Sequence, residues 1–356
     1  MVLVRQPLIS HAPAFYLISV PIFVISVSVV CFSKILPAVI ESSSNPCSPV
    51  TQPLPRTACV LSAFFRECLA TTTSRAFIAS FLAFVSALLT ITHVEASRRI
   101  NQPSTILTRP TLTWLAVNIV TGSVVSPVVL CANIKRHKDG IRLRPKDPRP
   151  EIDTALQSES SSEEVRPLIS NHDTDSSSTA PPVIHDRHLL SLQHTYAIPI
   201  SVLFGFVLPS ILLFEHPSPL VATLWNFFPV AIYAAHALAL RLLRDDRQSS
   251  FYAERDARSV VRIYAIPVTL SILAHIYLVT SWLYAKEEAQ DEWGPAPKLM
   301  LINFWTIVAT YLYWLLIESS FSTMTWAVLI ACFGGPGAGI SVGWVLKDLR
   351  HASLAE

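Results

Sequence analysis

Charged residues are scarce in this sequence. Only 15% of the 356 residues are Asp, Glu, Lys or Arg, whereas 51% are hydrophobic and the mean hydropathy is +0.45. A soluble domain of this length carries markedly more charge. The formal net charge of +2 argues against both a nucleic-acid partner and an acidic substrate. The composition therefore indicates a protein whose apolar surface is buried in membrane lipid.

Several motifs of catalysis and metal binding are also missing. The six cysteines form no C-x-x-C pair, so they support neither a zinc site nor a disulfide framework. No H-E-x-x-H, G-x-S-x-G or phosphate-binding loop occurs in a suitable context. Asp245-Asp246 is followed by Arg-Gln-Ser, which does not match the clustered carboxylates that hold magnesium diphosphate. We therefore expect no metal, no cofactor and no diphosphate ionisation.

What the sequence does contain is a series of uncharged apolar runs, each long enough for a helix to cross the hydrocarbon core. They predict an all-α, polytopic transmembrane helix bundle with about eight spans: Phe15–Phe32, Phe77–Val94, Leu112–Ala132, Tyr196–Phe214, Leu220–Leu240, Ile263–Tyr284, Leu299–Ile317 and Met324–Val345. The first run resembles a signal peptide, but Lys34 follows it directly, which favours an uncleaved helix. Gly334-Gly-Pro-Gly-Ala-Gly339 in the last run predicts close packing or a kink.

The segment between the third and fourth runs differs from the rest. It changes from a basic cluster to an acidic, serine-rich tract, which buries too little apolar area to fold and predicts a disordered loop. The expected organisation is an N-terminal membrane region of three helices (1–134), this loop (135–190), a C-terminal membrane region of five helices (191–346) and a tail (347–356). Basic residues beside spans stay in the cytosol, so the loop is expected to be cytoplasmic.

Threading the chain from that loop places Arg66 and Arg241 in the cytosol, and Glu95 and Glu215 at the lumenal boundary. Five helices then point polar groups at one lumenal layer, whose members are His93, Glu95, Asn118, Glu215, His216, Asn226 and Asn303, accompanied by aromatic residues that include Trp225 and Trp305. Ionisable groups at membrane depth are costly and mark functional sites. Each residue alone also fits a plain structural role, as a solvated helix end or an interfacial aromatic.

The layer predicts acid–base chemistry on a lipophilic substrate. A carboxylic acid at the edge of an apolar cavity stays protonated near neutral pH, and aromatic faces stabilise a cation. We expect Glu215 to be the acid, because the short loop with His216 and Pro217 holds it near the hydrocarbon. Glu95 is the second catalytic candidate, as a base or orienting group, because Arg98 can keep it ionised. The expected substrate-binding residues are His93, Asn118, His216, Trp225, Asn226, Asn303 and Trp305.

Three short segments resemble the fungal integral-membrane terpene cyclases of meroterpenoid and indole-diterpene pathways, among which the ascochlorin/ascofuranone-type and aflavinine-type cyclases are nearest in size and layout. The segments are Tyr196-Ala-Ile-Pro with Leu208-Pro209, Leu224-Trp-Asn-Phe-Phe-Pro229, and Tyr264-Ala-Ile-Pro267. The resemblance covers mainly Tyr196 to Trp344. It implies a metal-independent cyclase of the endoplasmic reticulum or another endomembrane, acting on a lipophilic prenylated small molecule that is epoxidised or olefinic. It does not identify the acid.

Two further readings stay open at this point. The repeated Tyr-Ala-Ile-Pro tetrapeptide indicates a duplicated helix pair. The alternative function is a non-enzymatic membrane protein, either a small-solute transporter or a lipid-binding receptor. A transporter usually shows charged or broken helices near the bilayer midplane, and this sequence places almost no charge there.

Overall fold

The computed structural model describes Pro37 and residues 56–98, 109–120, 122–130, 190, 192–243, 257–284 and 293–353. Within them the elements are α2 (Arg56–Cys68), α3 (Thr72–Ser97), α4 (Pro110–Val120), α6 (Leu192–Val202), the π-helical turn η5 (Leu203–Val207), α7 (Leu208–Glu215), α8 (Pro219–Asn226), α9 (Phe228–Leu242), α10 (Ala257–Tyr284), α11 (Pro295–Glu318), α12 (Phe321–Gly334) and α13 (Pro336–Ser353). Residues 122–130 are helical as well. The all-α prediction is confirmed for the described residues, which contain no strand; the expected first span and the expected loop up to residue 189 lie outside them.

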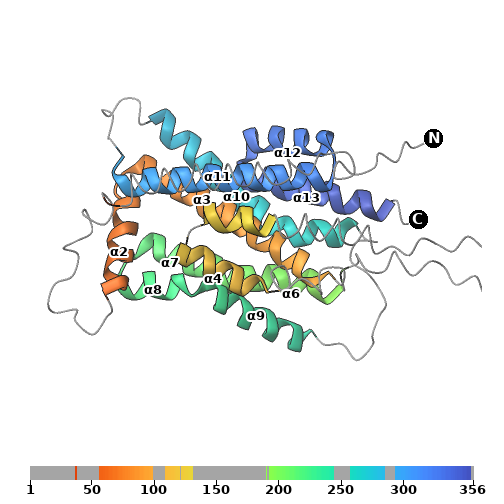
Figure 1. Ribbon diagram of the computed structural model, residues 1–356, viewed down its shortest axis with the longest axis horizontal. Coiled ribbons are helices and arrows are strands. Elements are labelled where there is room, and N and C mark those ends of the chain that lie inside the picture. Colours follow the sequence, from red (N-terminus) through yellow and green to blue (C-terminus); the bar gives the residue numbers. More distant parts are fainter. Residues whose placement is uncertain are drawn as a thin grey trace, which may run out of the picture.

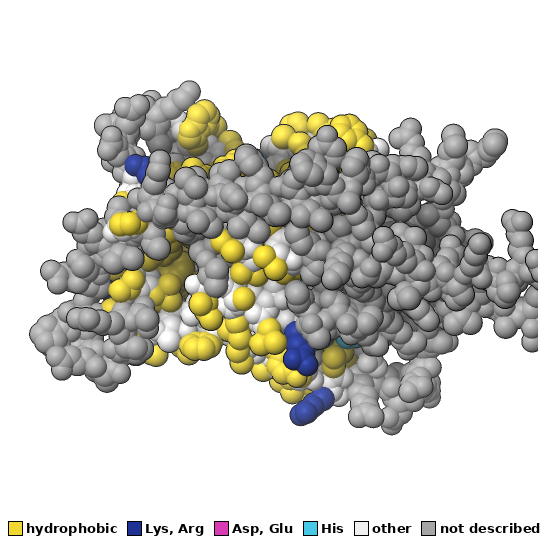
Figure 2. All heavy atoms as spheres, viewed as in Figure 1, with side chains coloured by type: hydrophobic (Ala, Val, Ile, Leu, Met, Phe, Trp, Pro, Cys, Tyr) yellow, Lys and Arg dark blue, Asp and Glu magenta, His cyan; other side chains and the backbone are white. Residues whose placement is uncertain are grey.

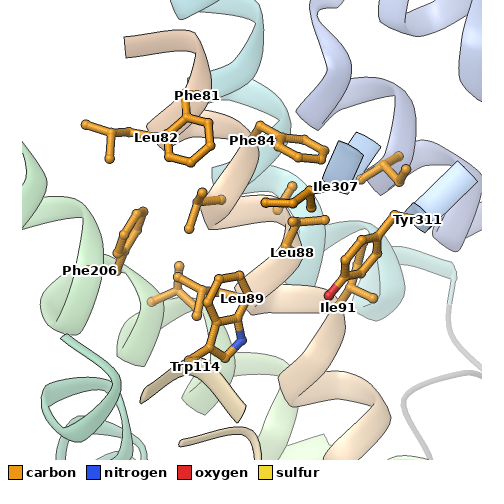
Figure 3. Close-up of a cluster of buried hydrophobic side chains, with 14 of the residues drawn as sticks. Phe81, Leu82, Phe84, Leu88, Leu89, Ile91, Trp114, Phe206, Ile307 and Tyr311 are labelled. Carbon is orange, nitrogen blue, oxygen red and sulfur yellow. The ribbon is translucent and has the colours of Figure 1, made fainter. Parts of the chain in front are cut away.

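Helix α3 is the central helix of the bundle. It begins at a capping box, in which the Thr71 hydroxyl accepts from the Ser74 N–H and the Ser74 side chain accepts from the Thr71 N–H. Nearly every side chain from Ser74 to Glu95 is buried. Figure 3 shows apolar side chains of α3 facing Trp114 of α4, Phe206 of η5 and Tyr311 of α11. The other helices therefore pack around α3 on several sides.

Four helical stretches are long and apolar enough to cross a membrane: Thr72–Ser97, Gln193–Glu215, Ala257–Tyr284 and Pro295–Glu318. A fifth crossing is formed only if α8 and α9 count as one span, because they meet at a bend of 58°. The described residues thus contain apolar helices of spanning length, as predicted, but the predicted number of about eight spans is not reached there. The predicted fifth run, Leu220–Leu240, is a bent pair of helices rather than one straight helix.

The predicted last span, Met324–Val345, is wrong as a single helix. It breaks at Gly335, whose φ of 84° lies in the left-handed region that favours glycine. Helices α12 and α13 then run antiparallel, since a side chain at Gly339 would meet Ala331 and one at Gly343 would meet Ala327. The predicted kink is therefore a complete reversal. It returns the C-terminal end of α13 to the end of α11, where the Arg350 guanidinium donates to the Ser320 hydroxyl.

The bundle has two ends with different contents, and Figure 1 shows α2 at one of them and the C-terminal part of α13 at the other. At the α2 end, the Ser62 hydroxyl donates to the Pro217 carbonyl at 2.7 Å, and the Ala296 N–H donates to the Glu67 carboxylate at 3.1 Å. At the opposite end, which we call the ionic end, α3, α11 and α13 all reach their C-terminal turns and α10 begins. Helix α3 connects the two ends, since its 26 residues span roughly 39 Å.

The predicted threading is therefore wrong for α3. It placed Arg66 and Arg241 on one membrane face and Glu95 with Glu215 on the other. In the structure Arg66 donates to the Pro217 carbonyl and so lies beside Glu215, whereas Glu95 lies at the ionic end. The physical reason is that basic residues lie at both ends, Arg66 and Arg75 at the α2 end and Arg241 at the ionic end, so local charge does not determine the direction in which α3 runs.

Apolar side chains also cover much of the outside. Ile119, Tyr284 and Phe333 are each more than 80% exposed, and many other large apolar residues of α7, α9, α10 and α12 are exposed as well. On the face shown in Figure 2, hydrophobic side chains predominate among the described residues. Water-exposed apolar surface on this scale is unfavourable in a soluble protein. Lipid contact around the bundle explains it.

Candidate functional site

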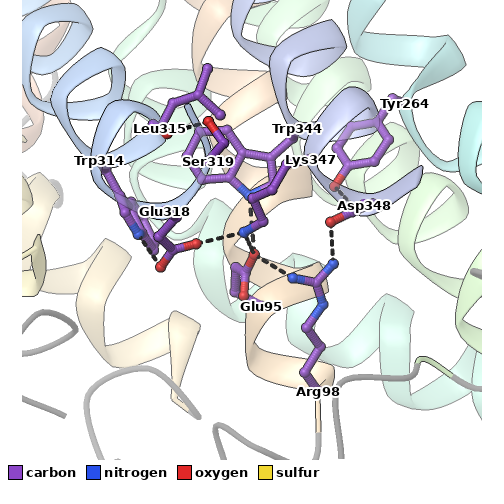
Figure 4. Close-up of polar contacts among 10 residues, drawn as sticks. All are labelled: Glu95, Arg98, Tyr264, Trp314, Leu315, Glu318, Ser319, Trp344, Lys347 and Asp348. Carbon is purple, nitrogen blue, oxygen red and sulfur yellow. Dashed lines mark hydrogen bonds and ion pairs between the residues drawn. The ribbon is translucent and has the colours of Figure 1, made fainter. Parts of the chain in front are cut away.

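A network of five buried ionisable side chains closes the ionic end, and we call it the ionic network. Its members are Glu95 and Arg98 at the end of α3, Glu318 at the end of α11, and Lys347 and Asp348 in α13. The ammonium of Lys347 lies 2.7 Å from Glu95 Oε1 and 2.6 Å from Glu318 Oε2 (Figure 4). No side chain of the network is more than 8% exposed. One cation thus bridges two carboxylates that come from different helices.

Arg98 connects this bridge to a third carboxylate, that of Asp348. Its guanidinium donates from Nη1 to Glu95 Oε1 at 2.8 Å and from Nη2 to Asp348 Oδ1. The other oxygen of Asp348 accepts from the Tyr264 hydroxyl at 3.3 Å. Glu95 and Arg98 share a helix face because residues three apart lie side by side. The predicted pairing of Arg98 with Glu95 is therefore confirmed.

Aromatic side chains line the network on the side of α11 and α13. The Trp314 indole N–H donates to Glu318 Oε1 at 2.6 Å, and the Trp344 indole N–H donates to Glu95 Oε1 at 3.0 Å. The centroids of the two indole rings lie 5.4 Å apart with the rings edge to face, and the Tyr311 ring lies tilted against Trp314 at the same centroid distance. We call Tyr311, Trp314 and Trp344 the aromatic triad; all three are buried. Carboxylates and aromatic faces are thus combined in one place.

The hydrogen-bonding of the network explains how so many ionisable groups tolerate burial. Removing a carboxylate or an ammonium from water costs several kcal/mol, and attraction to a partner offsets that cost only with good geometry and further hydrogen bonds. Each carboxylate here accepts from at least two donors, and the Lys347 ammonium also lies 5.0 Å from the centre of the Trp344 ring. Ionisable groups that are buried at the end of a membrane bundle despite this desolvation cost are the strongest indication of function in the described residues.

The structure separates the two predicted catalytic glutamates. Glu95 belongs to the ionic network, whereas Glu215 is an exposed residue at the α2 end, as is His216. The prediction that both glutamates lie in one layer is wrong. The loop after Glu215 leaves its side chain exposed rather than covered by protein.

The three predicted asparagines lie between the two ends and connect helices. The Asn118 amide donates to the Asn226 carbonyl at 2.7 Å, which ties α4 to the bend between α8 and α9. Asn303 accepts the Ser123 N–H at 2.8 Å, which ties the second helical part of the α4 region to α11. These contacts satisfy backbone groups where helices break. They do not reach the ionic network.

The two predicted tryptophans have opposite surroundings. Trp225 is buried against Phe65, Phe206 and Phe228, and its indole N–H donates to the Ser210 hydroxyl at 2.9 Å. Trp305 is 58% exposed on the outer surface. Trp305 therefore lies on the outside of the bundle, and its expected contact with a substrate inside the bundle is not supported by this position.

His93 is buried but turns away from Glu95, because residues two apart point to different sides of a helix. Its Nδ1 lies 2.8 Å from the Leu89 carbonyl and so donates to it. Its ring lies edge to face with His236, which in turn lies 3.3 Å, nitrogen to nitrogen, from His194. Among the described residues, no group of three or more His, Cys, Asp or Glu side chains is placed to hold a metal ion.

Sequence reasoning missed the partners that make Glu95 and Glu318 a site. Lys347 and Asp348 follow the last apolar run and were expected in the tail (347–356), outside the helix bundle. A signal for their position did exist, because Gly335-Pro336 in the middle of an apolar run combines a residue that favours the left-handed region with one that cannot continue a helix. Read as a reversal, that pair places Lys347 back at the end of α11.

Comparison with known proteins gives one match. A family model described as the CtvD domain matches residues 165–290, which include all of α6 to α10 but cover less than half of the chain. No curated protein and no solved structure matches the chain. CtvD is the name of a fungal biosynthetic-pathway protein. Over this segment the chain is similar to a domain linked to fungal secondary-metabolite biosynthesis.

Proposed function

We propose that this protein is a membrane-embedded, metal-independent terpene cyclase that protonates an epoxidised or olefinic prenyl chain and closes it into rings. The CtvD match supports a place in fungal secondary-metabolite biosynthesis. The apolar outer surface supports a lipophilic prenylated substrate that arrives through the membrane, in the endoplasmic reticulum or another endomembrane. One observation carries the finer assignment: Glu95 and Glu318 share the Lys347 ammonium directly beside the aromatic triad.

Glu318 is the proton donor in this proposal. Two carboxylates that contact one ammonium repel each other when both are ionised, so the pair favours holding one proton. Arg98 places a second positive charge 2.8 Å from Glu95, which stabilises the ionised form of that carboxylate. The shared proton is then left to Glu318, and Glu95 keeps Lys347 in position. In this assignment Glu318 replaces Glu215, which is exposed in the structure, as the proposed proton donor.

The aromatic triad supplies the second requirement of a cyclase. A carbocation is quenched by water and trapped by strong nucleophiles, whereas the face of an indole or phenol ring attracts it without forming a bond. Trp314 and Trp344 are at most 2% exposed, so water has little access to their rings. Their indole N–H groups also fix the two carboxylates at 2.6 and 3.0 Å. The acid and the cation-stabilising groups are therefore held as one unit.

For an epoxide, the first step is proton transfer and opening of the epoxide ring. The carboxyl proton of Glu318 moves to the epoxide oxygen, and the bond from that oxygen to the more substituted carbon breaks with its electron pair going to oxygen. The neighbouring alkene donates its π electrons to that carbon, which forms a carbon–carbon bond and moves the positive charge to the next tertiary carbon. For an olefin the proton goes instead to the less substituted carbon of the terminal double bond, whose π electrons form the new C–H bond, and the positive charge is left on the tertiary carbon. The Glu318 carboxylate that remains is stabilised by Lys347 at 2.6 Å.

Membranes from a heterologous host that expresses the full chain provide the test. They are incubated with an epoxidised prenyl-arene and with its olefinic parent, beside membranes from the empty host, and products are resolved by liquid chromatography and mass spectrometry. We expect a cyclised isomer of unchanged mass only when the chain is present, and a loss of about 10²- to 10⁴-fold for Glu318→Gln at equal expression. Uptake of either compound without conversion would overturn the proposal in favour of a carrier.

A further inference from the structure

The hydrogen bonds of the ionic network form one continuous sequence of groups with two different ends. From the Glu318 carboxyl it passes through Lys347 to Glu95, and from there through Arg98 to Asp348 and the Tyr264 hydroxyl. Glu318 lies at one end, beside the aromatic triad. Tyr264 lies at the other end, at the start of the third turn of α10 (Figure 4). The proposed function uses the first end and leaves the second without a role.

Tyr264 has the features of a proton-transfer group rather than of a surface tyrosine. It is 1% exposed, and its hydroxyl donates to Asp348 Oδ2 at 3.3 Å. The other oxygen of Asp348 is held by Arg98, so the carboxylate keeps a fixed direction toward the phenol. A phenol that donates to a carboxylate keeps lone pairs on its oxygen, and those lone pairs accept a proton when its own proton moves to the carboxylate.

The repeated tetrapeptide provides an internal comparison. Tyr196 opens the same Tyr-Ala-Ile-Pro sequence in α6, yet it is 44% exposed, and its hydroxyl accepts from the Arg262 guanidinium at 2.9 Å. Tyr196 thus contacts a cation at the surface, whereas Tyr264 contacts a buried carboxylate. The two copies of the motif have the same local sequence and different chemistry, because α13 brings Asp348 only to the copy in α10.

From this arrangement we infer that Tyr264 and Asp348 form the base that ends the cyclisation, an inference that rests on the proposed function. The final cation loses a proton from the carbon next to its charged centre, and the electron pair of that C–H bond becomes a new C=C bond. The proton goes to the Tyr264 oxygen as the Tyr264 hydroxyl proton moves to Asp348 Oδ2. Glu318 has given one proton and Asp348 has gained one, so the reaction is a net isomerisation. Exchange with water at the membrane surface then resets both groups.

This division of labour matches the chemistry required at each end. An acid and a base that act in the same turnover must stay in different protonation states, and they do so when their surroundings differ. Glu318 shares one ammonium with a second carboxylate, whereas Asp348 is paired with the delocalised guanidinium of Arg98 and accepts from a neutral phenol. The buried position of Tyr264 also keeps water from the cation at the step where water would compete for it.

Tyr264→Phe and Tyr196→Phe make the same chemical change at the two copies of the motif, so they form a matched pair. Both variants of the full chain are assayed in host membranes with the epoxidised prenyl-arene. The cyclic olefin, which keeps the mass of the substrate, and the alcohol formed by water capture, which is heavier by one water, are quantified separately. We expect Tyr264→Phe to lower the olefin roughly 10²-fold and to raise the share of alcohol, because an undeprotonated cation is captured by water. Tyr196→Phe should keep the wild-type rate and product ratio within about twofold. Asp348→Asn keeps the shape but cannot accept the proton, so it should shift the ratio in the same direction.

Different failures point to different parts of the account. Wild-type chain that converts neither compound overturns the proposed function and this inference with it. Wild-type activity with an unchanged olefin-to-alcohol ratio in Tyr264→Phe overturns only the inference. Equal losses of both products in Tyr264→Phe, with a lowered unfolding temperature in detergent, also overturn it, because that pattern is the mark of a structural role. Loss of olefin with a normal unfolding temperature supports it.

Discussion

The two ends of the bundle contain similar residue types, but these residues are exposed at one end and buried at the other. At the α2 end, Glu215 and His216 close an apolar helix and remain exposed. At the ionic end, Glu95 and Glu318 also close apolar helices, but they are buried around Lys347. The difference arises from the partner supplied by a distant part of the chain. A carboxylate at the end of a membrane helix becomes a site only when the fold brings it a cation.

The contacts that close each end differ in the same way. The α2 end is closed by hydrogen bonds between single side chains and backbone groups, such as Ser62 to Pro217 and Ala296 to Glu67. The ionic end is closed by contacts between opposite charges in a setting of low dielectric constant. Removing one partner of a neutral hydrogen bond costs about 1 to 3 kcal/mol, whereas removing one partner of a buried ion pair costs roughly 3 to 5 kcal/mol. Stability is therefore expected to be more sensitive to substitution at the ionic end.

The largest effect on stability is expected from Lys347→Met. This change keeps the length of the side chain and removes the ammonium that lies within 2.7 Å of two carboxylates. Glu95 and Glu318 would then face each other without that cation, at a cost of about 3 to 5 kcal/mol. Unfolding in detergent, followed by fluorescence of the eight tryptophans, measures the loss.

The matched control is Lys298→Met at the α2 end, where Lys298 is exposed in the first turn of α11. A surface substitution of this kind should change the free energy of unfolding by no more than about 0.5 kcal/mol. Equal destabilisation by the two variants would show that the ends do not differ as described.

The next effect concerns the reversal that creates the ionic end. In Gly339→Ala the new methyl group would meet the Ala327 carbonyl oxygen and the Ala331 side chain, so α12 and α13 would have to separate. We expect a loss of about 1 to 3 kcal/mol and a comparable fall in activity, since the hairpin positions Lys347. Ser322→Ala on the exposed side of α12 is the control and should have little effect. A wild-type unfolding curve for Gly339→Ala would mean that the two helices are not tightly packed.

The sequence predicted the helices better than it predicted their contacts. Apolar length alone correctly indicated α3, α10 and α11 and the continuous stretch from α6 to α7, because spanning a bilayer requires it. It also indicated Glu95 and its pairing with Arg98, since the two are three residues apart. The prediction failed where local sequence does not determine the direction in which the next helix runs. Reversal at Gly335 depends on small residues that fit between α12 and α13, and the Glu95–Lys347 contact joins residues 252 positions apart.

A smaller, qualitative effect distinguishes the two ends by their side of the membrane. Basic residues gather at the ionic end, with Arg241, Arg258, Arg262 and Arg350 close to its helix termini, which is typical of the cytosolic side. A glycosylation acceptor inserted between Tyr284 and Pro295 should therefore be modified in the endoplasmic reticulum. An acceptor in the Ser158 region, expected to be cytoplasmic, should stay unmodified. Gel mobility before and after deglycosylation shows whether each acceptor is modified. The reverse pattern would show that the bundle has the opposite orientation in the membrane.

The smallest effect is expected from removal of Gln157 to Pro182. Its composition predicts a disordered connection that contributes little to helix packing, so insertion and turnover should stay within about twofold of wild type. Expression, unfolding temperature and product yield of the deletion variant are measured beside the full chain. The deletion reaches into the segment that matches the CtvD domain, so loss of folded protein would show that this part of the match has a structural role.

The central claim is that the catalytic acid lies at the ionic end, and Glu318→Gln beside Glu215→Gln tests it most directly. Both variants replace a carboxyl at the end of an apolar helix by an amide of the same shape, and turnover of the epoxidised prenyl-arene is measured at equal expression. The account predicts that Glu318→Gln loses about 10²- to 10⁴-fold in turnover, whereas Glu215→Gln stays near the wild-type rate. Collapse of turnover in Glu215→Gln with full activity in Glu318→Gln would contradict it and place the acid at the α2 end.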